Sequence, residues 1–390
     1  MPVLNRIAEF QAEIAGWRHD FHTHPEILFD VQRTAGKVEA LLAEFGCDEI
    51  VTGMGRTGVV GIIKGRTNKS GRTIGLRADM DALPITEKTG APYASETPGK
   101  MHACGHDGHT AMLLGAAKYL AETRNFDGQI AVIFQPAEEG GGGGREMVAD
   151  GLMDRFGIDE VYGMHNWPGM PVGQFGIREG GIMAATDRFS IDIEGLGGHA
   201  ARPHTTVDPV IIAAQLIGAL QTIVSRNVDP LKSAVVSVTV MEAGEADNVI
   251  ARTARLKGTV RTLDSDVQDF IENKLNTFVP QFAETFGAKA SVNYLRGYPV
   301  TVNTPRETQF AATIAGEIAG VDRVDTDVAP SMGGEDFSFM LEQRPGAYIF
   351  LGNGDSSELH TDNYDFNDDA IPLGTSYWVR LAERALPLSA

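Results

Sequence analysis

Residues 73–84 read TIGLRADMDALP, and the first half of this stretch decides the fold class. TIGLRA is a short, continuous apolar run, which is typical of a strand that is buried on both faces of a sheet. Helical spacing of apolar side chains predicts helices at 4–20, 34–45 and about 107–124. Similar buried runs lie at 58–63, 129–134, 160–164 and 347–352. Because strands alternate with helices, we expect an α/β fold with a mostly parallel sheet flanked by helices.

The pattern changes near residue 186. DRFSIDIEG (187–195) alternates polar and apolar residues, as a strand with one exposed face does, and further strands are expected at 233–244 and 255–263. Helical patterns lie at 207–225 and from about 266. These elements predict a smaller α+β sandwich that is inserted into the larger domain. The expected domains are 1–185 and 297–390 for the larger one and 186–296 for the insertion.

The composition excludes several classes of protein. The 390 residues include 33 Lys and Arg against 52 Asp and Glu, which gives a net charge of −19. Nucleic-acid binding depends on clustered basic side chains, so this balance argues against it. No uninterrupted apolar stretch reaches ~18 residues, and the first residues lack the layout of a secretory signal. Two cysteines do not make a disulfide framework. We therefore expect a cytoplasmic protein without nucleic-acid or membrane partners.

Acidic and imidazole side chains follow three of the expected strands. Asp79 and Asp81 come after TIGLRA, Glu138 and Glu139 after QIAVIF, and His165 after EVYGM. Ligands of open α/β sheets bind at the carboxyl ends of the strands, so three such clusters at one sheet edge indicate a binding site. By itself, the pair of glutamates fits a solvated acidic turn equally well.

The segment MHACGHDGH (101–109) brings a thiol and an imidazole close together. Cys104 and His106 can reach one metal ion if the backbone between them turns tightly, which Gly105 permits. A cysteine nucleophile with a histidine base is an alternative, and so is a buried cysteine beside a helix-capping histidine. His360 lies in a polar loop and, taken alone, is typical of a surface histidine.

Three polar residues of the expected insertion are further candidates. His199 lies in a glycine-rich turn after a strand, where a lone histidine is usually structural. Asn248 and Arg261 are suited to bind a carbonyl and a carboxylate, the arginine through its planar fork. Arg261 equally fits a plain surface charge on an alternating strand.

Motifs along essentially the whole chain resemble those of the M20 metallopeptidase family. They are similar in particular to its amidohydrolase branch, which contains hippurate hydrolases, N-acyl-amino-acid amidohydrolases, auxin-conjugate hydrolases and N-acetyldiaminopimelate deacetylases. Several motifs are highly specific, and they occur in the expected order. They are WRHDFHTHPE (17–26), which is structural in the family, RADMDALP (77–84), MHACGHDGH (101–109), QPAEEGGGG (135–143), MHNWP (164–168), GGHAARPH (197–204), GGEDFSF (333–339) and LHTDNY (359–364).

The resemblance implies a catalytic domain with two divalent metal ions, interrupted by a lid-and-dimerisation domain. Glu138 matches the general base, and Asp81 matches the acid that orients a metal ligand from behind it. His199 matches a lid histidine that reaches the partner subunit's active site in dimers of the family. Asn248 and Arg261 match lid residues that contact substrate. The residues that match metal ligands are Cys104, His106, Glu139, His165 and His360.

The activity implied by the resemblance is hydrolysis of the amide bond of N-acyl-L-amino acids, such as hippurate or N-acetyl-amino acids. A metal-bridging hydroxide would attack the carbonyl, with Glu138 as general base. Alternatives are a dipeptide hydrolase or an N-acetyldiaminopimelate-type deacetylase, a cysteine-dependent hydrolase, and a non-catalytic ligand-binding homologue. The ligand set favours manganese or zinc and also suits cobalt or nickel. A homodimer, or a dimer of dimers through the inserted domain, is expected.

Overall fold

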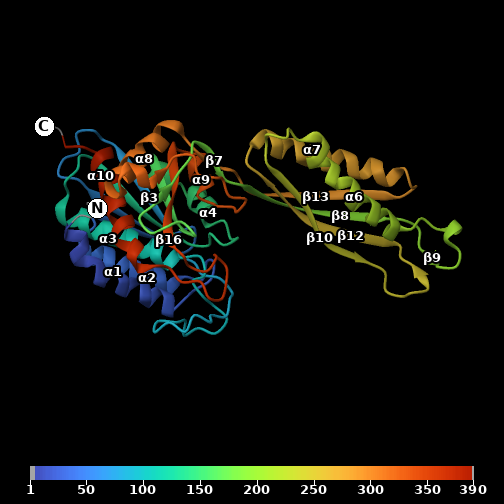
Figure 1. Ribbon diagram of the computed structural model, residues 1–390, viewed down its shortest axis with the longest axis horizontal. Helices are drawn as coiled ribbons and strands as arrows, with labels where there is room; N and C mark the ends of the chain where they lie inside the picture. Colours follow the sequence, from blue (N-terminus) through green and yellow to red (C-terminus); the bar gives the residue numbers. More distant parts are fainter. Residues whose placement is uncertain (1–4, 389–390) are drawn as a thin grey trace. The chain divides into compact units, whose positions relative to one another are not determined.

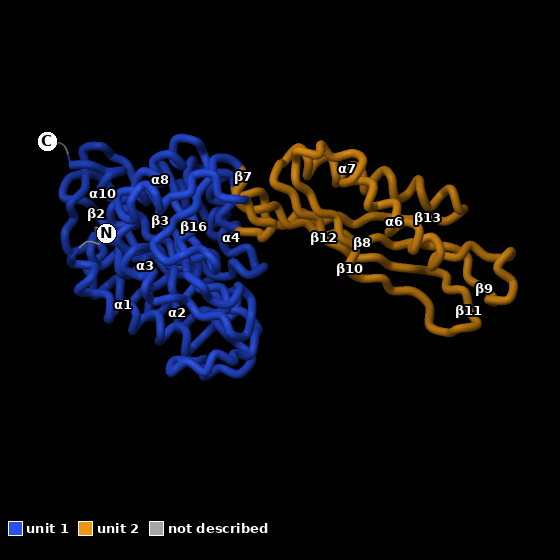
Figure 2. Tube along the Cα trace, in the orientation of Figure 1, with its two compact units in different colours: residues 1–180, 302–329, 336–390 blue, residues 181–301, 330–335 orange. Residues whose placement is uncertain are grey.

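The computed structural model describes residues 5–388, which form two compact units (Figure 2). The second unit comprises Gly181–Thr301 and Pro330–Glu335, and the remainder of the chain forms the first. The expected insertion, 186–296, lies inside the second unit. The segment 330–335, which we had assigned to the larger domain, belongs to the second unit because its backbone is paired there. Ser331 donates its N–H to the carbonyl of Ile182 (2.9 Å), and Ala184 donates to Gly333 (2.9 Å).

The first unit contains a mixed sheet of eight strands in the order β1-β2-β4-β3-β5-β16-β6-β15 (Figure 1). The central strands β4, β3, β5 and β16 are parallel to one another, whereas β1 and β2 run antiparallel to their neighbours. The expected α/β fold class is therefore confirmed, with an antiparallel edge that the apolar runs did not predict. The strands span Glu49–Met54 (β1), Gly58–Lys64 (β2), Thr73–Asp79 (β3), Gln129–Gln135 (β4), Ile158–Pro168 (β5), Phe175–Gly176 (β6), Val324–Asp325 (β15) and Gly346–Gly354 (β16).

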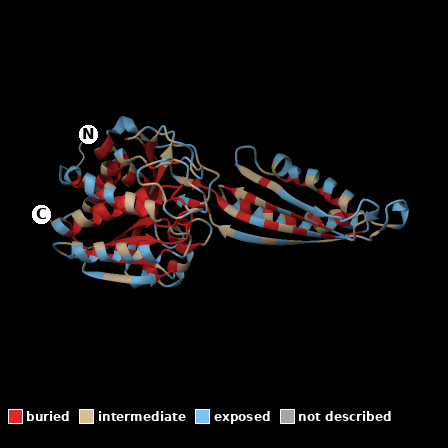
Figure 3. Ribbon diagram, turned by 90° about the horizontal axis from the view of Figure 1, so that it is seen from below, coloured by how far each residue is buried: buried red, intermediate tan, exposed pale blue. Residues whose placement is uncertain are grey.

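Helices enclose this sheet, and every residue of β3 is buried (Figure 3). A continuous apolar run suits such a strand, because neither of its faces meets water. The helices α1, α2, α3, α8 and α10 pack with one another, and α4 packs with α5 and α9. They span Asn5–Thr23 (α1), Gln32–Phe45 (α2), His106–Thr123 (α3), Gly143–Ala149 (α4), Leu152–Arg155 (α5), Pro305–Ala319 (α8), Ser338–Leu341 (α9) and Ile371–Ala385 (α10).

The second unit is the expected α+β sandwich. Its four-stranded antiparallel sheet has the order β10-β12-β8-β13, and the helices α6 and α7 pack on it. On β8, Phe189, Ile191 and Ile193 are buried in a common core with both helices, while the residues between them are more exposed. The elements span Ala185–Glu194 (β8), Gly198–His199 (β9), Pro209–Asn227 (α6), Ala234–Ala243 (β10), Val249–Ile250 (β11), Thr253–Thr262 (β12), Ser265–Glu284 (α7) and Lys289–Tyr298 (β13).

Short elements complete the described chain. They are β7 (Gly180–Met183), β14 (Thr301–Asn303) and the 3-10 turns Pro203–Thr205, Val321–Arg323 and Asp368–Ala370. Among residues 5–388, α6 is the one helix that is long and apolar enough to cross a membrane, and 33% of its most apolar window is buried within the protein. Its buried side chains Ile212, Leu216 and Ile223 recur at helical spacing in the core of the second unit, as in a helix that packs on a sheet.

Candidate metal centre

Parallel strands bring the polar groups at their carboxyl ends to one edge of the sheet. Asp79 ends β3 and lies in register with Gln135, the last residue of β4. His165 lies near the end of β5, the neighbour of β3 on the other side. The donor atoms of Cys104, His106 and His165 lie within 4.8 Å of one another. The segment that precedes α3 therefore meets the strand ends, as the sequence predicts.

The same cluster includes both glutamates and His360. Donor atoms of Cys104, Glu139 and His360 lie within 4.8 Å of one another, and so do those of His106, Glu138 and Glu139. His360 Nε2 lies 3.2 Å from Glu139 Oε1. All five residues that match metal ligands, together with the residue that matches the general base, therefore lie in one connected cluster of the first unit.

Backbone carbonyls orient the two buried imidazoles. His106 Nδ1 lies 2.7 Å from the carbonyl oxygen of Asp81, and His165 Nδ1 lies 2.6 Å from that of Asn166. A carbonyl can only accept, so Nδ1 carries the proton in each ring and Nε2 is left toward the cluster. The buried His106 Nε2 has no hydrogen-bond partner among the described residues. An imidazole held at one nitrogen and open at the other is the arrangement that metal ligands adopt.

The charges of the cluster also fit a cation. Burial raises the pKa of the Cys104 thiol well above its usual range, and Glu139 and Glu138 raise it further. Burial lowers the pKa of His106, but Asp79 and Asp81 outweigh it and bring the pKa to about 10. The surroundings therefore disfavour a negative charge on Cys104 and favour a positive charge on His106, which means that the site carries an excess of negative charge. A divalent cation would offset that excess and allow Cys104 to ligate as thiolate. The donor set therefore fits a metal centre, and its mixture of sulfur, nitrogen and oxygen suits several divalent ions.

Asp81 holds the two glutamates in place. Its buried carboxylate accepts the backbone N–H of Glu138 at Oδ1 (2.9 Å) and that of Glu139 at Oδ2 (3.1 Å). Its own backbone carbonyl holds His106, as described above. Asp81 therefore lies behind the cluster and contacts residues on two sides of it, which is where an orienting acid is expected.

Asp79 and His109 lie beside the cluster but are engaged with other groups. His109 Nδ1 lies 2.6 Å from Asp79 Oδ1, and His109 Nε2 accepts the backbone N–H of Asn166 (2.9 Å). Asp79 Oδ2 accepts from the guanidinium of Arg77 (2.8 Å). Burial raises the pKa of Asp79, but His106, Arg77 and His109 hold it well below its usual range. Donor atoms of Asp79, His106 and His109 also lie within 4.8 Å of one another, but both nitrogens of His109 are already in use, so we do not count Asp79 and His109 among the candidate ligands.

Gly105 is required by its surroundings. Its φ is +90°, and a Cβ at this position would lie 2.2 Å from Asn166 Nδ2 and 2.6 Å from the Tyr364 hydroxyl. An L side chain fits neither this backbone conformation nor this space. The tight turn that lets Cys104 and His106 face one another therefore depends on glycine.

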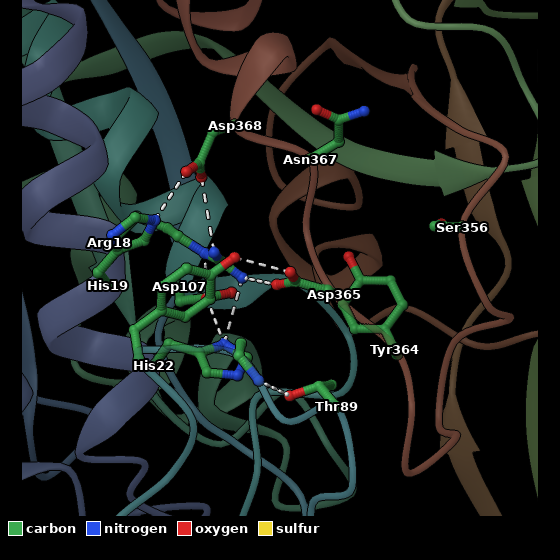
Figure 4. Close-up of polar contacts among 12 residues, drawn as sticks. Arg18, His19, His22, Thr89, Asp107, Ser356, Tyr364, Asp365, Asn367 and Asp368 are labelled. Atoms are coloured by element: carbon green, nitrogen blue, oxygen red, sulfur yellow. Dashed lines mark hydrogen bonds and ion pairs between the residues drawn. The ribbon is translucent and has the colours of Figure 1, made fainter.

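A buried ion-pair network lies behind the start of α3 (Figure 4). The fully buried Arg18 of α1 donates from Nε to Asp107 Oδ2 (2.8 Å) and also pairs with Asp365. Asp107 directly follows His106, and Asp365 lies in the loop that carries His360. Arg18 therefore ties α1 to two of the segments that form the cluster. The motif WRHDFHTHPE (17–26) predicts a structural role for this segment, but no sequence pattern indicates the role of Arg18, because its partners are distant in sequence.

His199 and Asn248 lie at the two-stranded sheet β11-β9 of the second unit, whereas Arg261 lies on β12 of its four-stranded sheet. His199 on β9 pairs with Val249 on β11, and the carbonyl of Asn248 accepts the N–H of Ala200 (3.0 Å), so His199 and Asn248 are neighbours. Arg261 lies near the carboxyl end of β12, eight residues beyond Thr253. At ~3.3 Å per residue this separation is roughly 26 Å. The structure thus brings His199 and Asn248 together and keeps Arg261 apart from them.

Comparison with known proteins identifies the family to which this chain belongs. A helix-covered α/β unit that gathers thiol, imidazole and carboxylate groups at its strand ends, in a chain that also forms a smaller α+β unit, is typical of a metal-dependent hydrolase. Residues 75–384 match the family described as Peptidase family M20/M25/M40, and the chain belongs to this family.

Curated relatives and solved structures cover almost the whole chain. The chain is 42% identical to a hippurate hydrolase of Campylobacter jejuni, over 99% of this chain and 100% of that protein. It is also 42% identical to an N-acetyl-L-cysteine deacetylase of Bacillus subtilis, over 97% and 90%. A dinuclear metal-binding M20 peptidase of Bacillus subtilis has a TM-score of 0.86 and 34% identity, with 97% of this chain and 99% of that chain covered. The protein is therefore a metal-dependent amidohydrolase of the M20 family, as the motifs predict.

Proposed function

We propose that the protein hydrolyses the amide bond of N-acyl-L-amino acids at a centre of two divalent metal ions. The observation that carries this proposal is a set of three overlapping groups of donor atoms, each group with its atoms within 4.8 Å of one another. The names of the hippurate hydrolase and deacetylase relatives support the substrate class. The residues that would hold the ions are Cys104, His106, Glu139, His165 and His360, with manganese or zinc favoured.

Glu138 would act as the general base. Bound divalent ions would lower the pKa of a water molecule and polarise the amide carbonyl. The Glu138 carboxylate lies beside His106 and Glu139, and the backbone N–H of Glu138 is fixed on Asp81. From there it would accept a proton from the attacking water and deliver it to the leaving amine nitrogen. Asp81 would hold the two glutamates and His106 in position for this transfer through its hydrogen bonds to them.

The substrate and the metal requirement can be tested together. We expect the purified protein to hydrolyse hippurate and a series of N-acetyl-L-amino acids, to lose this activity on dialysis against a chelator, and to regain it with Mn²⁺ or Zn²⁺. Dipeptides and N-acetyldiaminopimelate belong in the same panel, because they separate the alternative activities. Undiminished hydrolysis by the metal-free protein, combined with inactivation by a thiol alkylator, would instead support a cysteine-dependent hydrolase.

His199 and Arg261 would reach one substrate only from two chains. His199 is on β9, which pairs with β11 shortly before the Thr253 end of β12, whereas Arg261 is eight residues along β12, roughly 26 Å from Thr253. An N-acyl-amino acid, about the size of a dipeptide, spans only roughly 7–10 Å. We therefore propose a homodimer in which His199 and Asn248 serve the partner subunit's centre. Exposed apolar side chains on α6 and on the edge strand β10 support an interface between second units, notably Ile211, Val240 and Met241.

Mixing two inactive variants tests this shared site. His199→Ala and Glu138→Gln subunits, once exchanged, should recover about a quarter of wild-type activity, because half of the dimers are mixed and each mixed dimer holds one intact site. A matched control mixes His106→Ala with Glu138→Gln. Both of these changes fall in the first unit, so every site stays defective and no activity is expected. Failure of the first pair to recover activity despite proven exchange would rule out the shared site.

A further inference from the structure

Asn166 lies at the centre of the hydrogen bonds that support the cluster. It is fully buried and directly follows His165 on β5. It stands in the motif MHNWP, but no sequence pattern indicates a role for it. Its side chain and its backbone contact Cys104, His109, His165 and Tyr364, and Cys104 and His165 are proposed metal ligands.

The side-chain amide joins β5 to the segment that carries Cys104. Asn166 Nδ2 donates to the carbonyl oxygen of Cys104 (2.6 Å), and the Tyr364 hydroxyl donates to Asn166 Oδ1 (2.7 Å). The carbonyl of Cys104 can only accept a hydrogen bond, so the orientation of the amide is determined. Asn166 also occupies the space that a Cβ on Gly105 would need. A side chain at position 105 would therefore collide with the Asn166 amide, so the amide can occupy this place only because residue 105 is glycine.

The backbone of Asn166 completes the arrangement. Its carbonyl accepts Nδ1–H of His165 (2.6 Å), and its N–H donates to Nε2 of His109 (2.9 Å). His109 is held in turn by the buried carboxylate of Asp79 (2.6 Å). Asn166 is thus held by His109 through its backbone N–H, and its amide Nδ2 also lies 3.1 Å from His109 Nε2.

We propose that Asn166 is a positioning residue for the metal centre. Its amide couples the backbone of Cys104 to the strand that carries His165, and so sets the separation between Cys104 Sγ and His165 Nε2, which is 3.4 Å. This inference rests on the proposed function, in which both residues ligate metal. Partners of this kind fix the direction of a ligand, and their loss typically weakens metal binding by about 10- to 100-fold.

Metal titration of the purified full-length protein tests the proposal. Asn166→Ala should weaken Zn²⁺ binding by about 10- to 100-fold, measured by competition with a chromophoric chelator. It should also shift the thiolate-to-cobalt charge-transfer band of the Co²⁺-loaded protein, because the direction of the Cys104 sulfur changes. Asn303→Ala is the matched control. Asn303 is also a buried asparagine of the first unit, and its amide bonds the backbone of Tyr348 and Arg178 rather than any proposed ligand. Asn303→Ala should destabilise the protein but change neither the Zn²⁺ affinity nor the cobalt charge-transfer band.

The outcomes separate this proposal from the proposed function. If the wild-type protein binds no Zn²⁺, both fail. If the wild type binds Zn²⁺ but Asn166→Ala keeps its affinity within about 3-fold and an unshifted cobalt band, only the role of Asn166 is overturned. Should Asn166→Ala fail to fold, Tyr364→Phe provides the second variant. It removes the hydroxyl that holds Asn166 Oδ1 and should produce the same spectral shift with a smaller loss of affinity. An unchanged spectrum in that variant would contradict the proposal.

Discussion

Glu138→Gln is expected to retain its metal ions and to lose at least ~100-fold in kcat. Glutamine has the shape of glutamate but cannot accept the proton of the attacking water. The backbone N–H of residue 138 would still bind Asp81, so the neighbouring Glu139 should keep its place. Metal content by elemental analysis and kcat on the best N-acyl-amino acid of the panel are the two measurements.

Glu139→Gln is the matched control for this change. The two glutamates are adjacent, and the backbone N–H of each is held by one oxygen of the same Asp81 carboxylate. Glu139 also lies 3.2 Å from His360 and shares a donor cluster with Cys104. Its substitution should therefore lower metal content as well as turnover. Near-normal kcat in Glu138→Gln would remove Glu138 from the role of base, and loss of metal in that variant would make it a ligand.

Arg18→Met should lower the free energy of unfolding of the first unit by about 3–5 kcal/mol. The guanidinium is fully buried, and it faces the buried Asp107 and the partly exposed Asp365 and Asp368. Methionine fills a similar volume but leaves the charge of Asp107 buried without its main cation. All three tryptophans, Trp17, Trp167 and Trp378, belong to this unit, so tryptophan fluorescence during urea unfolding reports on it specifically.

Arg384→Met is the control for the loss of an arginine ion pair. Arg384 pairs with Glu317 on the surface of the same unit, where the arginine side chain is exposed and the glutamate side chain is partly exposed. Surface pairs are screened by water, so the expected loss is below about 1 kcal/mol. If the two variants lose similar stability, the buried network does not hold α1 to the metal centre as the structure suggests.

Elements with a distinct pattern of apolar residues could be predicted from the sequence. The buried strands β3, β4, β5 and β16 are continuous apolar runs, and α3 and α10 repeat apolar residues at helical spacing. The eight-stranded sheet is nevertheless mixed, because β1 and β2 pair antiparallel with their neighbours. The direction in which two strands pair depends on the path of the chain between them, and apolar patterns do not encode it.

Part of the candidate cluster could be predicted because Glu138, Glu139 and His165 follow strands, whereas His360 was expected only from the resemblance to the family. Parallel strands end at one edge, so Glu138, Glu139 and His165 were expected to meet, and the structure brings them together. The supporting residues could not be predicted in the same way. Arg18 and Asp107 are far apart in the chain, and Asn166 stands beside a candidate ligand with no pattern of its own. Their roles depend on partners that only folding brings within hydrogen-bond distance.

By itself, the sequence determined the family, the fold class and the chemical types gathered at the centre, because these depend on local patterns and on motifs of fixed spacing. Only the tertiary structure decided which atoms of these side chains face the candidate metal centre and which are held by other residues. It left Nε2 of His106 toward the cluster, engaged both nitrogens of His109 with Asp79 and Asn166, and placed His199 and Arg261 on different sheets of the second unit. The physical reason is that a hydrogen bond forms only when donor and acceptor lie about 3 Å apart, and the spacing of residues along the chain does not specify such distances.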